Sequence, residues 1–336
     1  MKKTYKHSKS FTILLLFLLL GICTLAGIIF GSVPLSLKDI LQVMLGRDTS
    51  STAYILITTI RIPRVLGGLL AGIGLACAGV ILQGVMNNSL ASPNTIGVNS
   101  GAGFFVMLAM LLFPGNITVI PVFAFLGALL TTLAVFALAM FSDSSRTTIV
   151  LAGITISSFL SAGTNTIKLL DTDITVNLTS FMIGSLSGLT LPTIVLPGIL
   201  ILIAFVVSLF FARALNLLNL GDDIARSLGL PITFTRFMLL VLSSILAGCV
   251  VSYAGLLSFI GLIVPHICRQ LFGNDARFLL PCSALLGASF VLLCDLLGRT
   301  LFSPYELPAG IIMSFIGGPF FLYLLLKKKG GRRIHA

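Results

Sequence analysis

The chain has 336 residues, of which 57% are hydrophobic and only 9% are charged. A soluble domain carries about a quarter charged residues, so this composition excludes an ordinary soluble protein and predicts a membrane protein solvated mainly by lipid. The net charge of +11 could indicate a nucleic-acid partner, but the basic residues gather at the two chain ends, which favours the positive-inside pattern of a membrane protein.

The chain begins with a basic stretch that is followed by an apolar run from Phe11 to about Phe30. This run is long for a signal-peptide core and long enough to cross a bilayer. Cys23 follows Ile22 rather than a small residue, so a lipoprotein cleavage site fits poorly. We therefore predict an uncleaved first span.

Apolar segments then follow one another with short polar breaks. Each is roughly the 20 residues that a helix needs to cross the hydrocarbon, whereas strands of a β-barrel would alternate over about ten residues. The ten predicted spans are 11–31, 63–82, 95–113, 118–141, 148–169, 191–212, 236–254, 256–272, 278–297 and 308–326. The seventh and eighth are hard to separate. The fold class is an all-α integral membrane protein, with one transmembrane domain over residues 1–336.

Ten spans place both chain ends on the same side. With the ends inside, fifteen of the 21 basic residues fall in inner segments, which supports cytoplasmic termini in a bacterial cell membrane. A polar segment over about 32–60 then lies outside, and its middle part, 35–45, has helical apolar spacing.

The longest inner loop covers about 216–235. Asp222 and Asp223 open a short helix, where carboxylates suit the positive helix N-terminus, and Gly229 followed by Pro231 closes it. This capped helix could be a simple connector or the docking site of a soluble partner.

Catalytic and nucleotide-binding motifs are missing from the sequence. It contains no GxxxxGK[ST], HExxH or GxSxG, and its six cysteines lie in or beside apolar stretches, as small core residues do. The acidic residues almost all fall in loops, and Asp295 is the nearest to an exception. These features predict neither an enzyme nor a bound cofactor or metal. They favour a subunit that takes its energy from another protein over a self-sufficient secondary transporter, which needs buried ionisable groups.

Small and polar residues mark three of the spans. Gly68 and Gly72 form a GxxxG that favours close helix packing. Ser157, Ser161 and Asn165 recur every four residues on one face of the fifth span, which indicates either hydrogen bonding to neighbours or a water-filled path. Ser314 offers a weaker case in the last span.

Several segments resemble the permeases of iron–siderophore, haem and cobalamin ABC importers, in matching order and spacing. They are RIPR (61–64), LQGVMNNSLASPNTIGVNSGAG (82–103), LGDDIARSLG (220–229), FIGLIVPHICRQLFGNDAR (259–277), LLPCSALLGA (279–288) and ELPAG (306–310). Two departures are NNSLASP at 87–93, where RNPLADP is usual, and Phe181, where tryptophan is common. They weaken the transfer of detailed gating or substrate properties.

The resemblance implies a dimer of permeases, equal or different, with two cytoplasmic ATP-binding subunits and an extracytoplasmic substrate-binding protein. It implies that the 216–235 loop contacts the ATPase, and the coupling residues are then Asp222, Asp223, Ala225, Arg226 and Gly229. It also implies that outward-facing guanidiniums grip acidic residues of the binding protein, here Arg61, Arg64 and Arg299. The expected cargo is a ferric siderophore first, then haem, then cobalamin.

Overall fold

The structure is a computed structural model that describes residues 9–49, 51–141 and 145–330. Within these ranges all regular secondary structure is helical. The basic residues Lys2, Lys3, Lys6, Arg332 and Arg333, used above for the orientation, lie outside the described residues.

Each predicted span corresponds to a helix. Among the described residues, seven helical runs are long and apolar enough to cross a membrane, and three further apolar stretches, 98–112, 260–272 and 309–324, are shorter. The ten are α1 (Lys9–Ile29), α4 (Ile62–Val85), α5 (Val98–Leu112), α6 (Ile120–Met140), α7 (Arg146–Leu170), α9 (Leu191–Phe210), α12 (Ile232–Ala254), α13 (Ile260–Phe272), α14 (Ala276–Thr300) and α15 (Ala309–Gly330).

Short helical segments join or extend these spans. They are α2 (Leu37–Met44), α3 (Thr52–Ile55), the π-helix η1 (Leu56–Arg61), the 3-10 helices η2 (Pro93–Ile96) and η3 (Ile117–Val119), α8 (Thr172–Ile183), α10 (Ala212–Asn219) and α11 (Asp222–Ser227). Helix α8 lies between the predicted fifth and sixth spans and has no counterpart in the prediction.

The second span starts earlier than predicted, because helical structure runs without a break from Thr52 to Val85. Ser51 caps this run by accepting from the Tyr54 amide. Pro63 lacks an N–H, so the usual hydrogen bond to the carbonyl of residue 59 cannot form, and the helix takes its π-helical turn just before this point. Part of the segment predicted to lie outside over 32–60 is therefore the extended start of this helix.

The seventh and eighth spans are separated by a non-helical segment over 255–259. Gly255 and Phe259 both have positive φ, 69° and 68°, a conformation that ends one helix and redirects the chain into the next. Helix α13 has only 13 residues, so at 1.5 Å per residue it spans about 20 Å, less than the hydrocarbon thickness.

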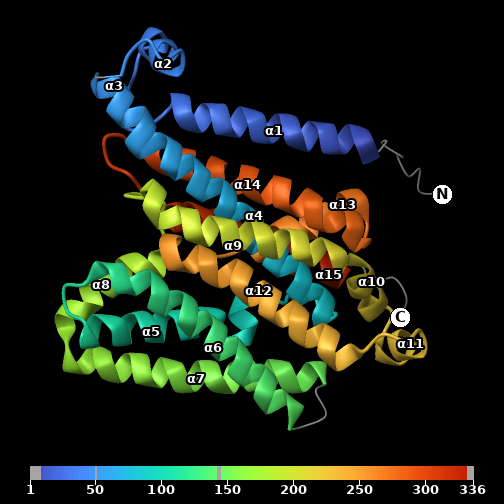
Figure 1. Ribbon diagram of the computed structural model, residues 1–336. Coiled ribbons are helices and arrows are strands. Elements are labelled where there is room, and N and C mark those ends of the chain that lie inside the picture. The colour runs from blue at the N-terminus through green and yellow to red at the C-terminus, as the bar shows by residue number, and fades with distance from the viewer. Residues whose placement is uncertain (1–8, 50, 142–144, 331–336) are drawn as a thin grey trace.

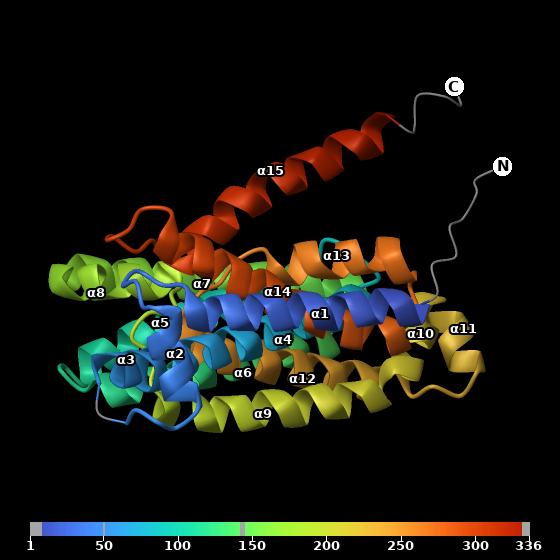
Figure 2. The same ribbon diagram turned by 90° about the horizontal axis from the view of Figure 1, so that it is seen from above.

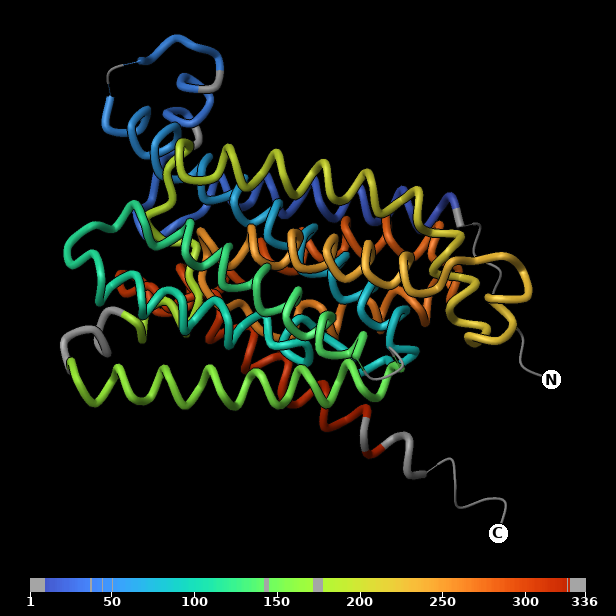
Figure 3. The backbone as a smooth tube through the Cα atoms, turned by 60° about the horizontal axis from the view of Figure 1, so that its bottom comes forward, coloured from blue at the N-terminus to red at the C-terminus, as the bar shows by residue number. Residues whose placement is uncertain are grey.

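Helix α4 is the centre of the bundle and packs against α14, α12, α13 and α9 (Figure 1). Helices α2 and α3 lie at one end of the bundle, and α10 and α11 lie at the other, where α1 begins (Figures 1 and 2). Helix α15 leaves the bundle at an angle (Figure 2), and α7 runs along its margin (Figures 1 and 3).

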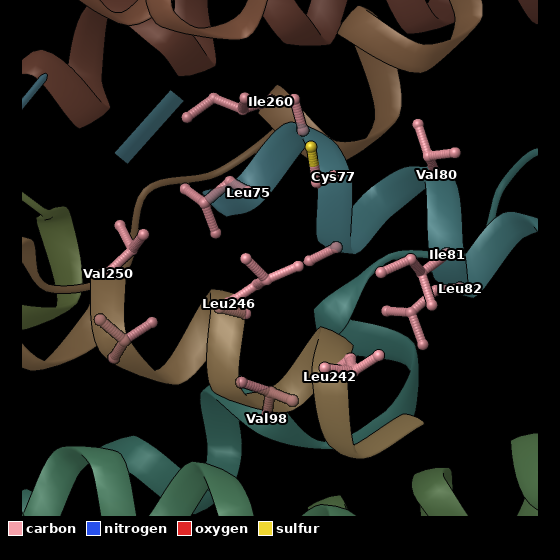
Figure 4. Packing of buried hydrophobic residues seen from close by; sticks show 14 of the residues in the cluster. Leu75, Cys77, Val80, Ile81, Leu82, Val98, Leu242, Leu246, Val250 and Ile260 are labelled. Carbon is pink, nitrogen blue, oxygen red and sulfur yellow. The ribbon is translucent and has the colours of Figure 1, made fainter. Parts of the chain in front are cut away.

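The core around α4 combines interdigitated aliphatic side chains with direct backbone contact. Leu75, Ile81 and Leu82 of α4 face Leu246 and neighbouring residues of α12 (Figure 4). A Cβ atom at Gly72 would overlap the backbone of Gly287 and Ala288 in α14, and one at Gly79 would overlap Gly261 in α13. The small residues predicted to favour close packing therefore allow α4 to touch two helices at once.

Candidate functional site

The three arginines expected to face outward lie at the end of the bundle that carries α2 and α3. The expectation of exposed guanidiniums is wrong for this structure, because Arg61, Arg64 and Arg299 are only 3–5% exposed. A buried guanidinium is costly unless charged or polar groups surround it, so each must have partners within the chain. Their proposed contact with a binding protein stays a prediction.

Arg64 is at the centre of this cluster. Its Nε lies 2.9 and 3.0 Å from the two carboxylate oxygens of Asp295, and its Nη1 lies 2.7 Å from Oε2 of Glu306. Asp295 comes from α14 and Glu306 from the loop before α15, so this one side chain joins α4 to two other parts of the chain. The pair Arg64–Asp295 is buried, with both side chains 6% exposed or less.

Arg61 and Arg299 are held mainly by backbone carbonyls. Arg61 donates to the carbonyls of Ile28, Ile29 and Val33 at 2.5–2.8 Å, and Arg299 donates to that of Gly27 at 2.7 Å. The Arg299 Nε also lies 3.5 Å from Asp295. The cluster thus holds three guanidiniums and two carboxylates, Asp295 and Glu306, which leaves it with an excess positive charge.

Glu306 closes the cluster on its accessible side. Burial alone would raise the pKa of this carboxyl, but hydrogen bonds from Arg64 and Ser32 and the charge of Arg64 hold the pKa below its ordinary value. The side chain is therefore a carboxylate throughout the neutral range. Beside it is a cavity of about 200 Å³, whose lining includes Ser32, Arg61, Arg64, Arg299 and Glu306.

At the opposite end, α11 is a single short helix with defined caps. Asp222 and Asp223 form its first turn, as predicted. At its end, Gly229 has a φ of +81°, the Gly229 amide donates to Arg226, and the Leu230 amide donates to Ala225. This double hydrogen bond is a Schellman motif, so the predicted closure at Gly229 is confirmed.

The predicted coupling residues differ in what they can reach. Asp223, Arg226 and Gly229 are exposed. Ala225 is fully buried and so acts only through packing. Asp222 forms ion pairs with two arginines of its own chain, Arg146 at 2.8 Å and Arg236 at 2.6 Å, although its side chain stays 37% exposed.

An exposed apolar surface at α11 was missed in the sequence. Leu220, Ile224 and Leu228 are 58%, 50% and 60% exposed. Ile224 lies in α11 and Leu228 is its C-cap, four residues apart on one helical face, whereas Leu220 precedes Gly221 and the start of the helix. The signal was present, because Ile224 and Leu228 stand at helical spacing within the predicted short helix.

The loop that carries α11 is also anchored to α14. Asn216 Nδ2 donates to Asp275 Oδ1 at 2.8 Å, and its Oδ1 accepts from the Ala276 amide at 2.8 Å. Hydrogen bonds from Arg277 and Asn216 hold the pKa of Asp275 well below its ordinary value. Asp275 also caps α14 by accepting from the Arg277 amide.

The predicted path residues lie on sparsely covered faces. In α7, Ser161 and Asn165 are exposed and Ser157 is half-buried, and Thr155, Ser158 and Thr166 add further polar groups to the exposed side. Ser314 of α15 is exposed and lines a cavity of about 410 Å³ with Met182, Ile183 and Ser258. The exposed hydroxyls of Ser158 and Ser314 donate hydrogen bonds to carbonyls of their own helices.

Within the described residues, no group of three or more His, Cys, Asp or Glu could hold a metal ion.

Comparisons with known proteins match nearly the whole chain. Residues 17–327 match the model of the FecCD transport family. The Fe(3+)-citrate import system permease protein YfmE of Bacillus subtilis is 37% identical over 97% of this chain and 98% of its own length. The hemin transport system permease protein HmuU of Yersinia pestis is 35% identical over 94% of this chain and 96% of its own length.

A solved structure supports the same relationship. It is an inward-facing conformation of an ABC transporter assigned to the metal-chelate type. The two folds superpose with a TM-score of 0.83 at 31% sequence identity, over 93% of this chain and 97% of the other.

Proposed function

The chain belongs to the FecCD transport family, and on this premise we propose that it forms the membrane path of an importer for an iron complex. As a member it is a permease subunit of an ABC importer, a multi-pass protein of the bacterial cell membrane and not an enzyme. The observation that carries the proposal is the match to iron-complex permeases over nearly the full length of the chain.

The proposed cargo is a ferric siderophore, with haem second and cobalamin third. Relatives named for Fe(3+)-citrate, siderophore and hemin transport support an iron complex. The chain itself supplies no group of metal ligands among its described residues, which suits a cargo that enters with its iron already chelated.

The path is proposed to form between two permease subunits, identical or different. Polar side chains on a membrane helix favour water or another protein over lipid. The exposed side of α7 carries Ser161 and Asn165, and Ser314 is exposed on α15, which leaves the bundle at an angle (Figure 2). A second subunit facing α7 and α15 would enclose these residues in a shared water-filled path.

The end of the molecule with α10 and α11 is proposed to be cytoplasmic and to contact one of two ATP-binding subunits. Arg146, Arg213, Arg226, Arg236, Arg269 and Arg277 belong to the segments assigned to this side, as the positive-inside pattern requires. The exposed apolar side chains of Leu220, Ile224 and Leu228, beside exposed Asp223 and Arg226, suit contact with a protein groove.

We expect Ile224→Asp combined with Leu228→Asp to lower the amount of copurifying ATPase subunit by roughly tenfold or more, because two apolar anchors of the contact are replaced by charges. Quantitative copurification from membranes measures this effect. Leu41→Asp on α2 is the matched control, since Leu41 is 58% exposed at the opposite end. Equal ATPase recovery with both variants would rule out α11 as the contact.

The end with α2 and α3 is proposed to receive the substrate-binding protein. The excess positive charge of Arg61, Arg64 and Arg299 and the neighbouring cavity support attraction of acidic side chains. Because the guanidiniums are buried, the acidic groups of the partner would reach them through this cavity, beside Glu306, rather than by contact with a free surface.

Uptake into proteoliposomes tests the function as a whole. The chain, its ATPase and its binding protein are reconstituted, and ferric citrate, a ferric hydroxamate, hemin and cobalamin are offered in turn. We expect ATP-dependent accumulation of one of the iron complexes, which stops when an ATPase variant that cannot hydrolyse ATP is used. Accumulation by the chain alone that collapses with an ionophore would instead identify a secondary transporter.

A further inference from the structure

Asp222 connects α11 to two other helices through ion pairs. Its Oδ1 accepts from Arg146 Nη2 at 2.8 Å, and its Oδ2 accepts from Arg236 Nη2 at 2.6 Å. Arg146 is the first residue of α7, and Arg236 lies in the second turn of α12. The same Nη2 of Arg146 also donates to the Leu218 carbonyl of α10 at 2.8 Å. One arginine thus ties the start of α7 to both short helices of the loop.

The two arginines differ in their surroundings. Arg236 is buried, at 3% exposure of its side chain, and α12 packs against the central helix α4. The Arg146 side chain is 23% exposed, and α7 packs mainly against α5, α6, α8 and η2 rather than against α10 or α11. Arg236 therefore connects Asp222 to the core of the bundle. Arg146 connects Asp222 to α7, which lies at the edge of the bundle.

Helix α7 is suited to move as one body. It runs for 25 residues without a proline, and only a small share of its apolar length is buried. Arg146 and Asn165 are separated by about 28 Å along the axis at 1.5 Å per residue. A displacement at Arg146 would therefore shift the polar face that carries Ser157, Ser161 and Asn165.

We propose that the ion pair between Arg146 and Asp222 passes movement of α11 to α7, and that Arg146 and Arg236 are positioning residues of the transport cycle. The proposal rests on the proposed function, in which an ATPase displaces α11 and α7 lines the path. A charge-assisted hydrogen bond suits this role, since it is directional and can re-form after each displacement.

The test uses the full complex with Arg146→Gln, which removes the charge, Arg146→Lys, which keeps it, and Arg213→Gln as a matched control. Arg213 lies at the same end on α10 and is exposed. The first readout is iron complex imported per ATP hydrolysed. We expect Arg146→Gln to lower this ratio by about tenfold, Arg146→Lys to lower it by less, and Arg213→Gln to leave it unchanged.

A second readout reports the position of α7. Ser161→Cys adds one exposed thiol to a chain whose six cysteines are all buried, so a membrane-impermeant maleimide labels position 161 selectively. We expect the labelling rate to change several-fold between the ATP-free and the ATP-vanadate states, and this change to vanish with Arg146→Gln. A role of Arg146 in folding alone would not remove the ATP dependence of labelling.

The outcomes separate this inference from the function on which it rests. If Arg146→Gln keeps normal import per ATP and normal labelling changes, the ion pair transmits nothing and the inference is overturned, although the permease function stands. If labelling at position 161 ignores ATP even with Arg146 intact, α7 does not move and the inference also fails. Copurification of the ATPase with Arg146→Gln, at the level of the unsubstituted chain, shows that docking on α11 persists.

Discussion

Replacing Arg64 by methionine should destabilise the folded protein by about 3–5 kcal/mol, the cost of leaving a buried partner without its counter-charge. Asp295 is 2% exposed and takes three close contacts from Arg64. Arg299 stays 3.5 Å from Asp295 and offers only partial compensation. We expect the loss to lie towards the lower limit of this range for that reason.

The measurement is circular dichroism of the helical signal during titration of detergent micelles with a denaturing detergent. Arg47→Met is the matched control, since Arg47 is exposed near the same end of the bundle, and it should change the free energy of unfolding by about 0.5 kcal/mol or less. The double variant Arg64→Met and Asp295→Leu removes both buried charges and should recover part of the loss. Equal unfolding midpoints for Arg64→Met and Arg47→Met would show that the pair does not stabilise the fold.

Replacing Gly72 by leucine should destabilise the fold by about 3 kcal/mol, at the upper end of the usual cost of overpacking. A side chain at this position meets the backbone of Gly287 and Ala288, which cannot rotate away as a flexible side chain can. The expected result is a lower unfolding midpoint and aggregation on size exclusion in detergent.

Gly21→Leu provides the control for this substitution. A Cβ at Gly21 of α1 meets no atom within 4 Å, so the added side chain would face lipid, where leucine is favourable. If Gly72→Leu behaved like Gly21→Leu, the close contact between α4 and α14 would not exist in the folded protein.

Hydropathy was enough to predict most of the fold, since each span had to satisfy its own backbone in lipid. The closure of α11 at Gly229 was also predictable, because glycine and proline act locally. The interruption before α13 was harder to predict, since Gly255 and Phe259 lie within a continuous apolar run. Hydropathy does not distinguish helical residues from residues with positive φ that end a helix.

The state of the arginines could not be predicted from local sequence. Arg61 and Arg64 stand at the outer edge of the predicted second span and suggest exposure, but the partners that bury Arg64 come from positions 295 and 306. Asp222 likewise suggested a contact with a separate subunit, whereas Arg146, 76 residues earlier in the chain, occupies it. Such pairings depend on tertiary packing, which local sequence patterns do not encode.

Contact between the backbones of α4, α13 and α14 also limits how the molecule can change shape. Helices that meet through glycine have no intervening side chains to exchange rotamers, so shear between them would require backbone atoms to collide. We therefore expect α4, α13 and α14 to stay fixed relative to one another. Changes of shape are then expected at the periphery, as at α15, which contacts α13 and α14 at one end and projects from the bundle (Figure 2).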